Sequence, residues 1–183
     1  MRLALVLAAC ALAPAASAQP GSPTTVSWGV GAVGPGTDLG PGFSVGVRHG
    51  LLALDPDAVP DAVPEPLATL LRAGHGWTVA ADGFGQRGFE HSGGRWLAGG
   101  GLLLRWDPVS DRAPVRPYFV VASLGAYAGV ERAGRPAALG LGVGNGFGLE
   151  VPVGGRAVSL ELRSVGMVTG GGTSLPVTFG FSF

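Results

Sequence analysis

The chain has 183 residues, and its 12 arginines balance its 12 carboxylates to a formal net charge of zero, which offers no electrostatic case for binding nucleic acid. Glycine and proline are frequent, at 34 and 15 residues, but a hydrophobic content of 46% argues against a disordered chain. Charged residues make up only 13%, against about 25% in soluble domains, so the composition disfavours an ordinary water-facing surface.

The first 18 residues have the features of a secretory signal peptide. Arg2 supplies a positive charge, an apolar run follows over residues 3–12, and an A-x-A cleavage site ends at Ala18. The run is too short for a membrane-spanning helix. A second interpretation makes Cys10 a lipidated N-terminus, although the apolar run continues past it. We expect cleavage after Ala18, which leaves 19–183 as one domain without cysteine and so without disulfide or thiolate chemistry.

After the signal peptide, eight segments alternate apolar residues with small or polar ones, and turn signals separate them. Side chains on a strand alternate between its two faces, so each segment predicts a strand with one apolar face. The fifth segment is apolar at both its odd and its even positions, so the sequence does not decide which of its faces points into the barrel. We expect the strands at 25–33, 42–49, 77–85, 95–106, 117–128, 139–150, 156–168 and 174–183.

The last segment carries the most specific signal, because Phe179, Phe181 and Phe183 share one face and the chain ends on the aromatic. This ending resembles the C-terminal strand of bacterial outer-membrane β-barrels, whose terminal aromatic is the assembly signal of that family. The alternation over nearly the whole mature chain resembles small eight-stranded barrels of the OmpA/OmpX type. The phrases RPYFVVASLGAY and GNGFGLEVPVGGR also look like middle strands of porin-family outer-membrane β-barrel domains.

The resemblance implies an all-β fold, an eight-stranded antiparallel up-and-down transmembrane β-barrel in the outer membrane of a Gram-negative cell envelope. Its partners would be outer-membrane lipid and, through the C-terminal strand, the barrel-assembly machinery. We expect a monomer with a structural or minor envelope role, without catalysis, cofactor or metal. The alternatives are an outer-membrane lipid-modifying enzyme and a secreted lipocalin-like binder of an apolar ligand, which needs a dry apolar interior.

Four tryptophans fit the aromatic girdles that flank the apolar band of a membrane barrel. Trp96 and Trp106 are ten residues apart. At ~3.3 Å per residue and a tilt of ~40°, that separation spans roughly 25 Å, the height of the band. We therefore assign Trp28, Trp77, Trp96 and Trp106 to the girdles, against the alternative of core tryptophans in a soluble barrel.

Seven charged residues fall on the inward parity of the expected strands. Buried charges must pair, and the lumen of an eight-stranded barrel is only wide enough to be filled by side chains. We therefore favour a salt-bridged structural core over a gated pore or a proton path. The expected lumen cluster is Arg48, Asp82, Arg95, Arg105, Glu150, Glu161 and Arg163. Asn145, on the lipid-facing parity, is the exception, and it lies either near a rim or against a partner.

The connection at 50–76 departs from the family, whose periplasmic turns are short. With both ends of the barrel in the periplasm, this longest connection falls on the periplasmic side, with 107–116 and 151–155. Its four prolines exclude a continuous central strand, and 66–73 predicts a short helix. The insert would plug the periplasmic mouth, contact another envelope protein, or show that 42–49 and 77–85 do not pair.

Three candidate chemical motifs remain weak. Glu90, His91 and Ser92 combine an acid, a base and a hydroxyl, as lipid A deacylases do on an eight-stranded barrel. The His and Ser of those enzymes lie two apart, whereas adjacent residues on a strand point in opposite directions. Residues 29–34 match G-x-G-x-x-G, but Pro35 and Gly36 follow where a nucleotide site needs a helix. The three histidines have no metal-ligand spacing.

Overall fold

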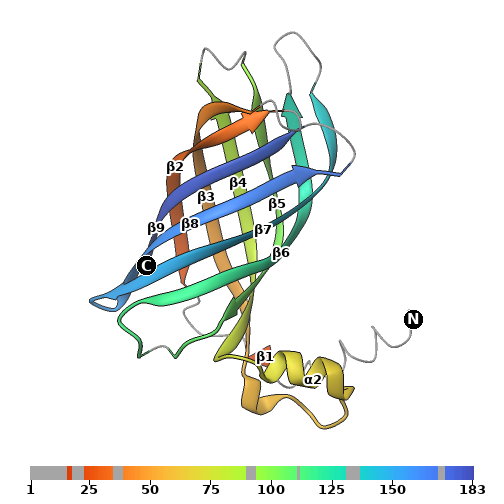
Figure 1. Ribbon diagram of the computed structural model, residues 1–183, viewed down its shortest axis with the longest axis vertical. Coiled ribbons are helices and arrows are strands. Elements are labelled where there is room, and N and C mark those ends of the chain that lie inside the picture. Colours follow the sequence, from red (N-terminus) through yellow and green to blue (C-terminus); the bar gives the residue numbers. More distant parts are fainter. Residues whose placement is uncertain are drawn as a thin grey trace.

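The structure, a computed structural model, describes residues 16–17, 23–34, 39–89, 94–110, 112–130, 137–168 and 172–183. Eight long antiparallel strands follow one another around a closed barrel, and pairing of the first with the last completes it (Figure 1). The prediction of an eight-stranded all-β barrel is confirmed. The strands are β2 (Thr24–Gly34), β3 (Gly40–Leu54), β4 (Gly76–Gly88), β5 (Trp96–Asp107), β6 (Arg116–Val130), β7 (Ala138–Val153), β8 (Arg156–Met167) and β9 (Thr173–Ser182).

The expected signal peptide lies almost wholly outside the described residues, and Cys10 with it. Its described part is a two-residue strand, β1 (Ala16–Ser17), which pairs with Ala53 and Leu54 at the end of β3. No helix among the described residues is long and apolar enough to cross a membrane.

The strands are strongly staggered. A path that starts at Trp77 on β4 and steps from each residue to its cross-strand partner passes once around the barrel through all eight strands. It returns to β4 at Arg87, ten residues beyond Trp77. Ten residues amount to ~33 Å along a strand, against a circumference of ~38 Å for eight strands spaced ~4.7 Å apart. The strands are therefore tilted by about 40° from the barrel axis, within the range of closed barrels.

A β-bulge in β6 explains why the facing of this segment stayed open in the sequence. Val120 pairs with Gly146 and Ser123 pairs with Gly144, so two residues of β6 face the single Asn145 of β7. The extra residue reverses the parity of the strand. Before the bulge the even-numbered residues of β6 point inward, as Tyr118 does, and after it the odd-numbered residues do, as Tyr127 does. Both tyrosines are buried.

The connection between β7 and β8, which we expect on the periplasmic side, is a tight turn. Gly154 and Gly155 are its two residues, with φ of 56° and 79°. Positive φ at both central positions is the conformation of a two-residue hairpin turn, and glycine adopts it without steric cost.

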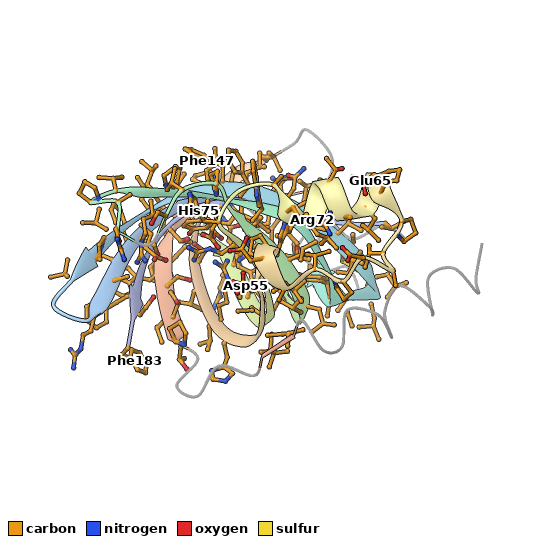
Figure 2. All side chains as sticks on the ribbon, turned by 90° about the horizontal axis from the view of Figure 1, so that it is seen from below. Asp55, Glu65, Arg72, His75, Phe147 and Phe183 are labelled. Carbon is orange, nitrogen blue, oxygen red and sulfur yellow. The ribbon has the colours of Figure 1, made fainter. Side chains whose placement is uncertain are left out.

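The long insert is shorter than expected, because β3 continues through a bulge to Leu54 and stays paired with β4. The alternative that the segments 42–49 and 77–85 do not pair is therefore wrong. The insert contains a 3-10 turn, η2 (Pro56–Ala58), and a helix, α2 (Glu65–Arg72). The helix lies at the lower end of the barrel and to one side of its opening (Figures 1 and 2).

The insert packs against outward side chains of β4 and β5, so it does not plug the lumen. Val63 and Leu71 are buried against Trp77, and Leu104 and Trp106 complete this cluster. The indole N–H of Trp106 donates a hydrogen bond to the Ala73 carbonyl, at 2.8 Å. The outer side of β4 and β5 at this end of the barrel is thus covered by the chain itself.

Candidate functional site

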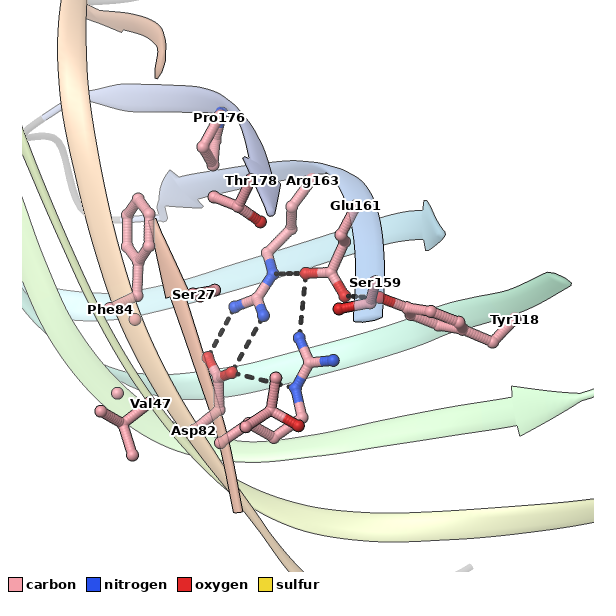
Figure 3. A pocket seen from close by; sticks show the side chains of 14 residues that line it. Ser27, Val47, Asp82, Phe84, Tyr118, Ser159, Glu161, Arg163, Pro176 and Thr178 are labelled. Atoms are coloured by element: carbon pink, nitrogen blue, oxygen red, sulfur yellow. Dashed lines mark hydrogen bonds and ion pairs between the residues drawn. The ribbon is translucent and has the colours of Figure 1, made fainter. Parts of the chain in front are cut away.

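The middle of the lumen holds a network of two arginines and two carboxylates, contributed by β3, β4 and β8 (Figure 3). Arg163 on β8 donates two hydrogen bonds to Asp82 on β4, at 2.6 and 2.9 Å, and one to Glu161, at 2.9 Å. Arg48 on β3 donates to Asp82 at 3.3 Å and to Glu161 at 2.9 Å. The Tyr118 hydroxyl donates to Glu161 at 2.8 Å.

This central network ties opposite walls of the barrel together. β4 and β8 are four strands apart in an eight-stranded ring, and Arg163 reaches across the lumen between them. The four charges sum to zero, and their side chains are largely buried, with that of Arg48 the most exposed at 15%. A buried ion pair repays its desolvation only when further hydrogen bonds satisfy it, which the bidentate Arg163–Asp82 contact and the Tyr118 hydroxyl provide.

A second network lies below the first, towards the end of the barrel where β2 begins and β9 ends. Arg105 donates to Asp107 at 2.6 and 2.8 Å and to Glu150 at 3.0 Å, and Arg116 also pairs with Glu150. The Arg105 guanidinium lies 4.1 Å from the centre of the Tyr118 ring, whose hydroxyl belongs to the central network. Tyr118 therefore links the two networks through a cation–π contact and a hydrogen bond.

The structure brings six of the seven expected lumen charges into these networks. Arg95 immediately precedes β5 and lies at the opposite end of that strand from Arg105. Sequence reasoning missed Asp107 and Arg116, which lie one residue beyond the expected ends of their strands. The alternation of strand faces could have identified Asp107, because it lies two residues after Arg105 and therefore on the same inward face.

The upper part of the lumen holds an apolar cluster beside the buried polar side chains of Ser44, Gln86 and Ser174, so the expected salt-bridged core fills only part of the lumen. Val33, Phe84, Leu97, Tyr127 and Val165 form a buried cluster from five strands. The alternation along each strand predicted that Val33, Phe84, Leu97 and Val165 point inward, but it left the direction of Tyr127 on β6 open. The combination of the five was not predictable, since strands distant in sequence supply them. Together they form a second plug, towards the end where β2 ends and β9 begins.

Little space remains between these side chains. The central network leaves a cavity of about 20 Å³, room for about one water molecule. Below it, a vestibule of about 830 Å³ opens between Arg48, Arg105, Arg156 and Phe183. The lumen is thus a blind vestibule under two successive plugs.

Glycines on the inner face make room for the lumen side chains. A Cβ on Gly148 would collide with the Tyr118 ring, and one on Gly142 with the Tyr127 ring. Gly29 and Gly31, from the G-x-G-x-x-G match, lie within β2 against the backbone of β9. These glycines therefore line a strand and do not form a phosphate loop.

The outer face of the wall is apolar around the barrel. Among its exposed side chains are Val30, Phe43, Leu102, Leu124, Leu141, Phe147, Leu160 and Phe179. A water-soluble monomer rarely exposes a continuous apolar patch above a few hundred Å², whereas a barrel facing lipid requires one. The outer face therefore has the chemistry of a lipid-facing surface.

The four assigned tryptophans differ in their surroundings. Trp28 is 49% exposed on the outer face, and Trp96 and Trp106 are half-buried. Trp77 faces outward by parity, but it is only 5% exposed because the insert covers it, so its assignment to a lipid-facing girdle is corrected. Of the terminal aromatics, Phe179 and Phe183 are exposed, and Phe181 contacts Arg156.

Glu90, His91 and Ser92 lie outside the described residues. His49 has a hydrogen bond with the Thr24 hydroxyl, at 2.9 Å, and His75 lies at the vestibule.

Twelve chains of solved structures match this fold. Neisserial surface protein A matches with a TM-score of 0.63 and 16% identity, over 91% of this chain and 97% of that one. Ail of Yersinia pestis, solved with the heparin analogue sucrose octasulfate, matches with a TM-score of 0.46 and 13% identity, over 88% and 99%. The N-terminal β-barrel domain of Pseudomonas aeruginosa OprF gives 0.44 and 13%, over 87% and 97%.

No protein-family model matches the chain, and neither does a curated protein. The likeness to the neisserial barrel shows the fold, that of a small bacterial outer-membrane barrel. The outer face of this chain has the chemistry that such a location requires.

Proposed function

We propose that the protein is an integral outer-membrane β-barrel that does not conduct solutes and has a structural role in the cell envelope. The observation that carries this proposal is the contrast between an apolar outer wall and a lumen closed twice, by the central ionic network and by the apolar plug above it. The fold itself is compatible with many functions, so the argument rests on these two surfaces.

The filled lumen argues against a pore. A solute entering from the vestibule meets Arg48, Arg163 and their carboxylates, and beyond them the packed side chains of Phe84 and Leu97. Opening a path means separating buried ion pairs and an apolar cluster together, which is costly in a low-dielectric interior.

The same arrangement argues against the lipocalin-like alternative. A lipocalin-type binder keeps an apolar cavity inside a soluble barrel. Here the apolar surface is on the outside, and the open vestibule is lined by arginines and carboxylates such as Arg105, Asp107 and Glu150.

We further propose that β9 delivers the chain to the barrel-assembly machinery. β9 forms the closing pair with β2, and Phe179 and Phe183 project from its outer face. These aromatics are therefore available to a partner before and during closure.

The test is to express the full chain, isolate the outer membrane, and compare gel mobility with and without boiling. Outer-membrane fractionation with a mobility shift on boiling is the expected result. Purified protein in planar bilayers should then show no steady conductance above that of the lipid alone. A soluble protein without a shift contradicts the membrane barrel, and steady single channels contradict the closed lumen.

A further inference from the structure

The helix α2 of the insert has an apolar side that is wider than its contact with the barrel. Ala68 and Leu71 are 1% and 9% exposed, and both pack in the cluster around Trp77. Leu67 is partly buried at the margin of the same cluster. Leu70 follows Leu67 at the i, i+3 spacing of neighbours on a helix surface, and it is 53% exposed. Leu70 is therefore the uncovered flank of this apolar side.

Another side of α2 is polar. Glu65, Thr69 and Arg72 recur at the spacing i, i+4 and i+7, which places them along one face of the helix, and all three are exposed. Arg72 donates a hydrogen bond to the Val59 carbonyl, at 3.3 Å, and its guanidinium lies 3.5 Å from the Asp61 carboxylate. The helix thus has one side on the barrel, an exposed apolar flank, and an exposed polar face.

The surface beneath the insert is continuous with the apolar outer wall of the barrel. A row of neighbouring rings runs from Trp77 through Trp106 and Phe119 to Phe147, with centroids 6.1, 5.5 and 6.0 Å apart. Exposure rises from 5% at Trp77 to 39% at Phe119 and 45% at Phe147, which lies in the middle part of β7 and points away from the barrel (Figure 2). In the outer membrane, the insert therefore stands on a wall whose neighbouring surface contacts lipid.

The position of α2 gives meaning to the exposure of Leu70. A single exposed leucine is common on soluble proteins and decides nothing alone. Here, however, the helix lies at one end of the barrel, beside its opening and against outward side chains of β4 and β5 (Figure 1). At that level the hydrocarbon of a membrane meets its headgroups, and a helix lying there needs one apolar and one polar side. Leu70 and the Glu65 face supply both.

We propose that α2 is an interfacial helix, which lies in the headgroup layer of the adjoining leaflet. Leu70 contacts the acyl chains, and Glu65 and Thr69 face water. The partner of the insert is thus membrane lipid and not another envelope protein, which was the alternative that the sequence left open. This inference rests on the proposed membrane barrel, and it assigns a lipid contact to a segment outside the strands.

Fluorescence quenching in lipid vesicles without any other protein tests the proposal. In the full chain with Cys10→Ser, the variants Leu70→Cys and Thr69→Cys each carry one cysteine for an environment-sensitive fluorophore. A nitroxide near the headgroup end of a lipid acyl chain should quench the Leu70 probe about threefold more than the Thr69 probe, and aqueous iodide should show the reverse preference. Equal quenching at the two positions, or the opposite order, overturns the interfacial helix.

A third labelled position separates this failure from failure of the membrane barrel. Leu124 is 62% exposed on the outer face of β6, away from the insert, so a probe on Leu124→Cys should be quenched by lipid nitroxides. Quenching at Leu124 without quenching at Leu70 overturns the interfacial helix and leaves the membrane barrel intact. Absence of quenching at Leu124 contradicts the membrane barrel, and the interfacial helix with it.

A second pair of variants tests whether lipid holds the helix in place. Leu70→Gln removes the apolar flank, and glutamine has nearly the helix propensity of leucine. Amide hydrogen exchange over residues 65–72 in the same vesicles should become severalfold faster, whereas Thr69→Gln should leave it unchanged. Both variants should keep the mobility shift on boiling, since neither side chain belongs to the buried cluster. Unchanged exchange in Leu70→Gln would mean that contact with the barrel alone holds α2, which overturns the proposal.

Discussion

Neighbouring residues of β8 show how differently the two faces of the barrel wall are built. Leu160 and Leu162 face outward and are 40% and 50% exposed, whereas Glu161 and Arg163 face inward and are 5% and 6% exposed. The outer residues need only be apolar, because lipid adapts to their shape. The inner residues depend on named partners, since Arg163 must reach Asp82 across the lumen. The effect of a substitution should therefore depend on whether the residue faces the lumen or the outside. On the outer face it should also depend on how deep the residue lies in the membrane.

The largest expected effect comes from removing one member of the central network. Asp82→Ala leaves Arg163 without its bidentate partner and the network with a net positive charge. Breaking a buried ion pair by removing one partner destabilises by roughly 3–5 kcal/mol. The free energy of unfolding, measured by denaturant titration in detergent micelles or liposomes, should fall by that amount.

The matched control for Asp82→Ala restores neutrality. Asp82→Ala with Arg163→Met keeps Arg48 paired with Glu161 and removes the stranded charge. The double variant should recover a large part of the loss, so the two substitutions should be strongly non-additive. Additive losses would mean that the network acts as packing and not as paired charge.

A smaller effect is expected from the apolar plug. Leu97 is fully buried inside the lumen, whereas Leu102 on the same strand is 55% exposed to the outside. Leu97→Ala should lower the free energy of unfolding by roughly 2–4 kcal/mol, because it loses both burial and packing around a cavity. Leu102→Ala should lose less, since lipid fills the space. Equal losses would contradict the distinction between the two faces.

Charge placed on the outer face should show the depth dependence of a lipid-facing wall. Val143→Arg, near the middle of β7, should cost about 2–4 kcal/mol, and Val153→Arg, at its end, about 0–1 kcal/mol. Both positions are exposed and apolar on the same strand. Unfolding titrations in liposomes measure both variants. Equal costs at the two depths would argue that this wall faces water.

Strand number and the facing of most strands were readable from the sequence because a period of two in hydrophobicity is a local property. The facing of β6 was not, because the bulge at Val121 reverses parity, and an apolar segment carries no mark of where an extra residue sits. The expected end of β5 and the expected start of β6 were each one residue short, which hid the roles of Asp107 and Arg116.

The surroundings of Trp77 illustrate the limit of such local reasoning. Parity placed it outward, which is its direction in the structure, but its burial depends on Val63 and Leu71 folding back from the insert. Likewise, the inward parity of Phe84 and Leu97 was visible, whereas their contact with Val33 and Val165 depends on stagger around the closed barrel. Contacts made by closure are properties of the whole ring.

The smallest effect on stability is expected at Phe183, an outer-face residue that we propose the barrel-assembly machinery recognises. Phe183 is 63% exposed, and its backbone N–H and C=O both bond to Thr24, so Phe183→Ala leaves these contacts in place. The free energy of unfolding of refolded protein should change by less than about 1 kcal/mol. If the assembly machinery reads the terminal aromatic, the amount in the outer membrane of cells should nevertheless fall severalfold. Leu175→Ala, outward on the same strand, is the matched control and should leave that amount unchanged. Equal cellular levels for Phe183→Ala and the parent chain would show that an exposed aromatic here serves only the lipid boundary, as the other outer-face side chains do.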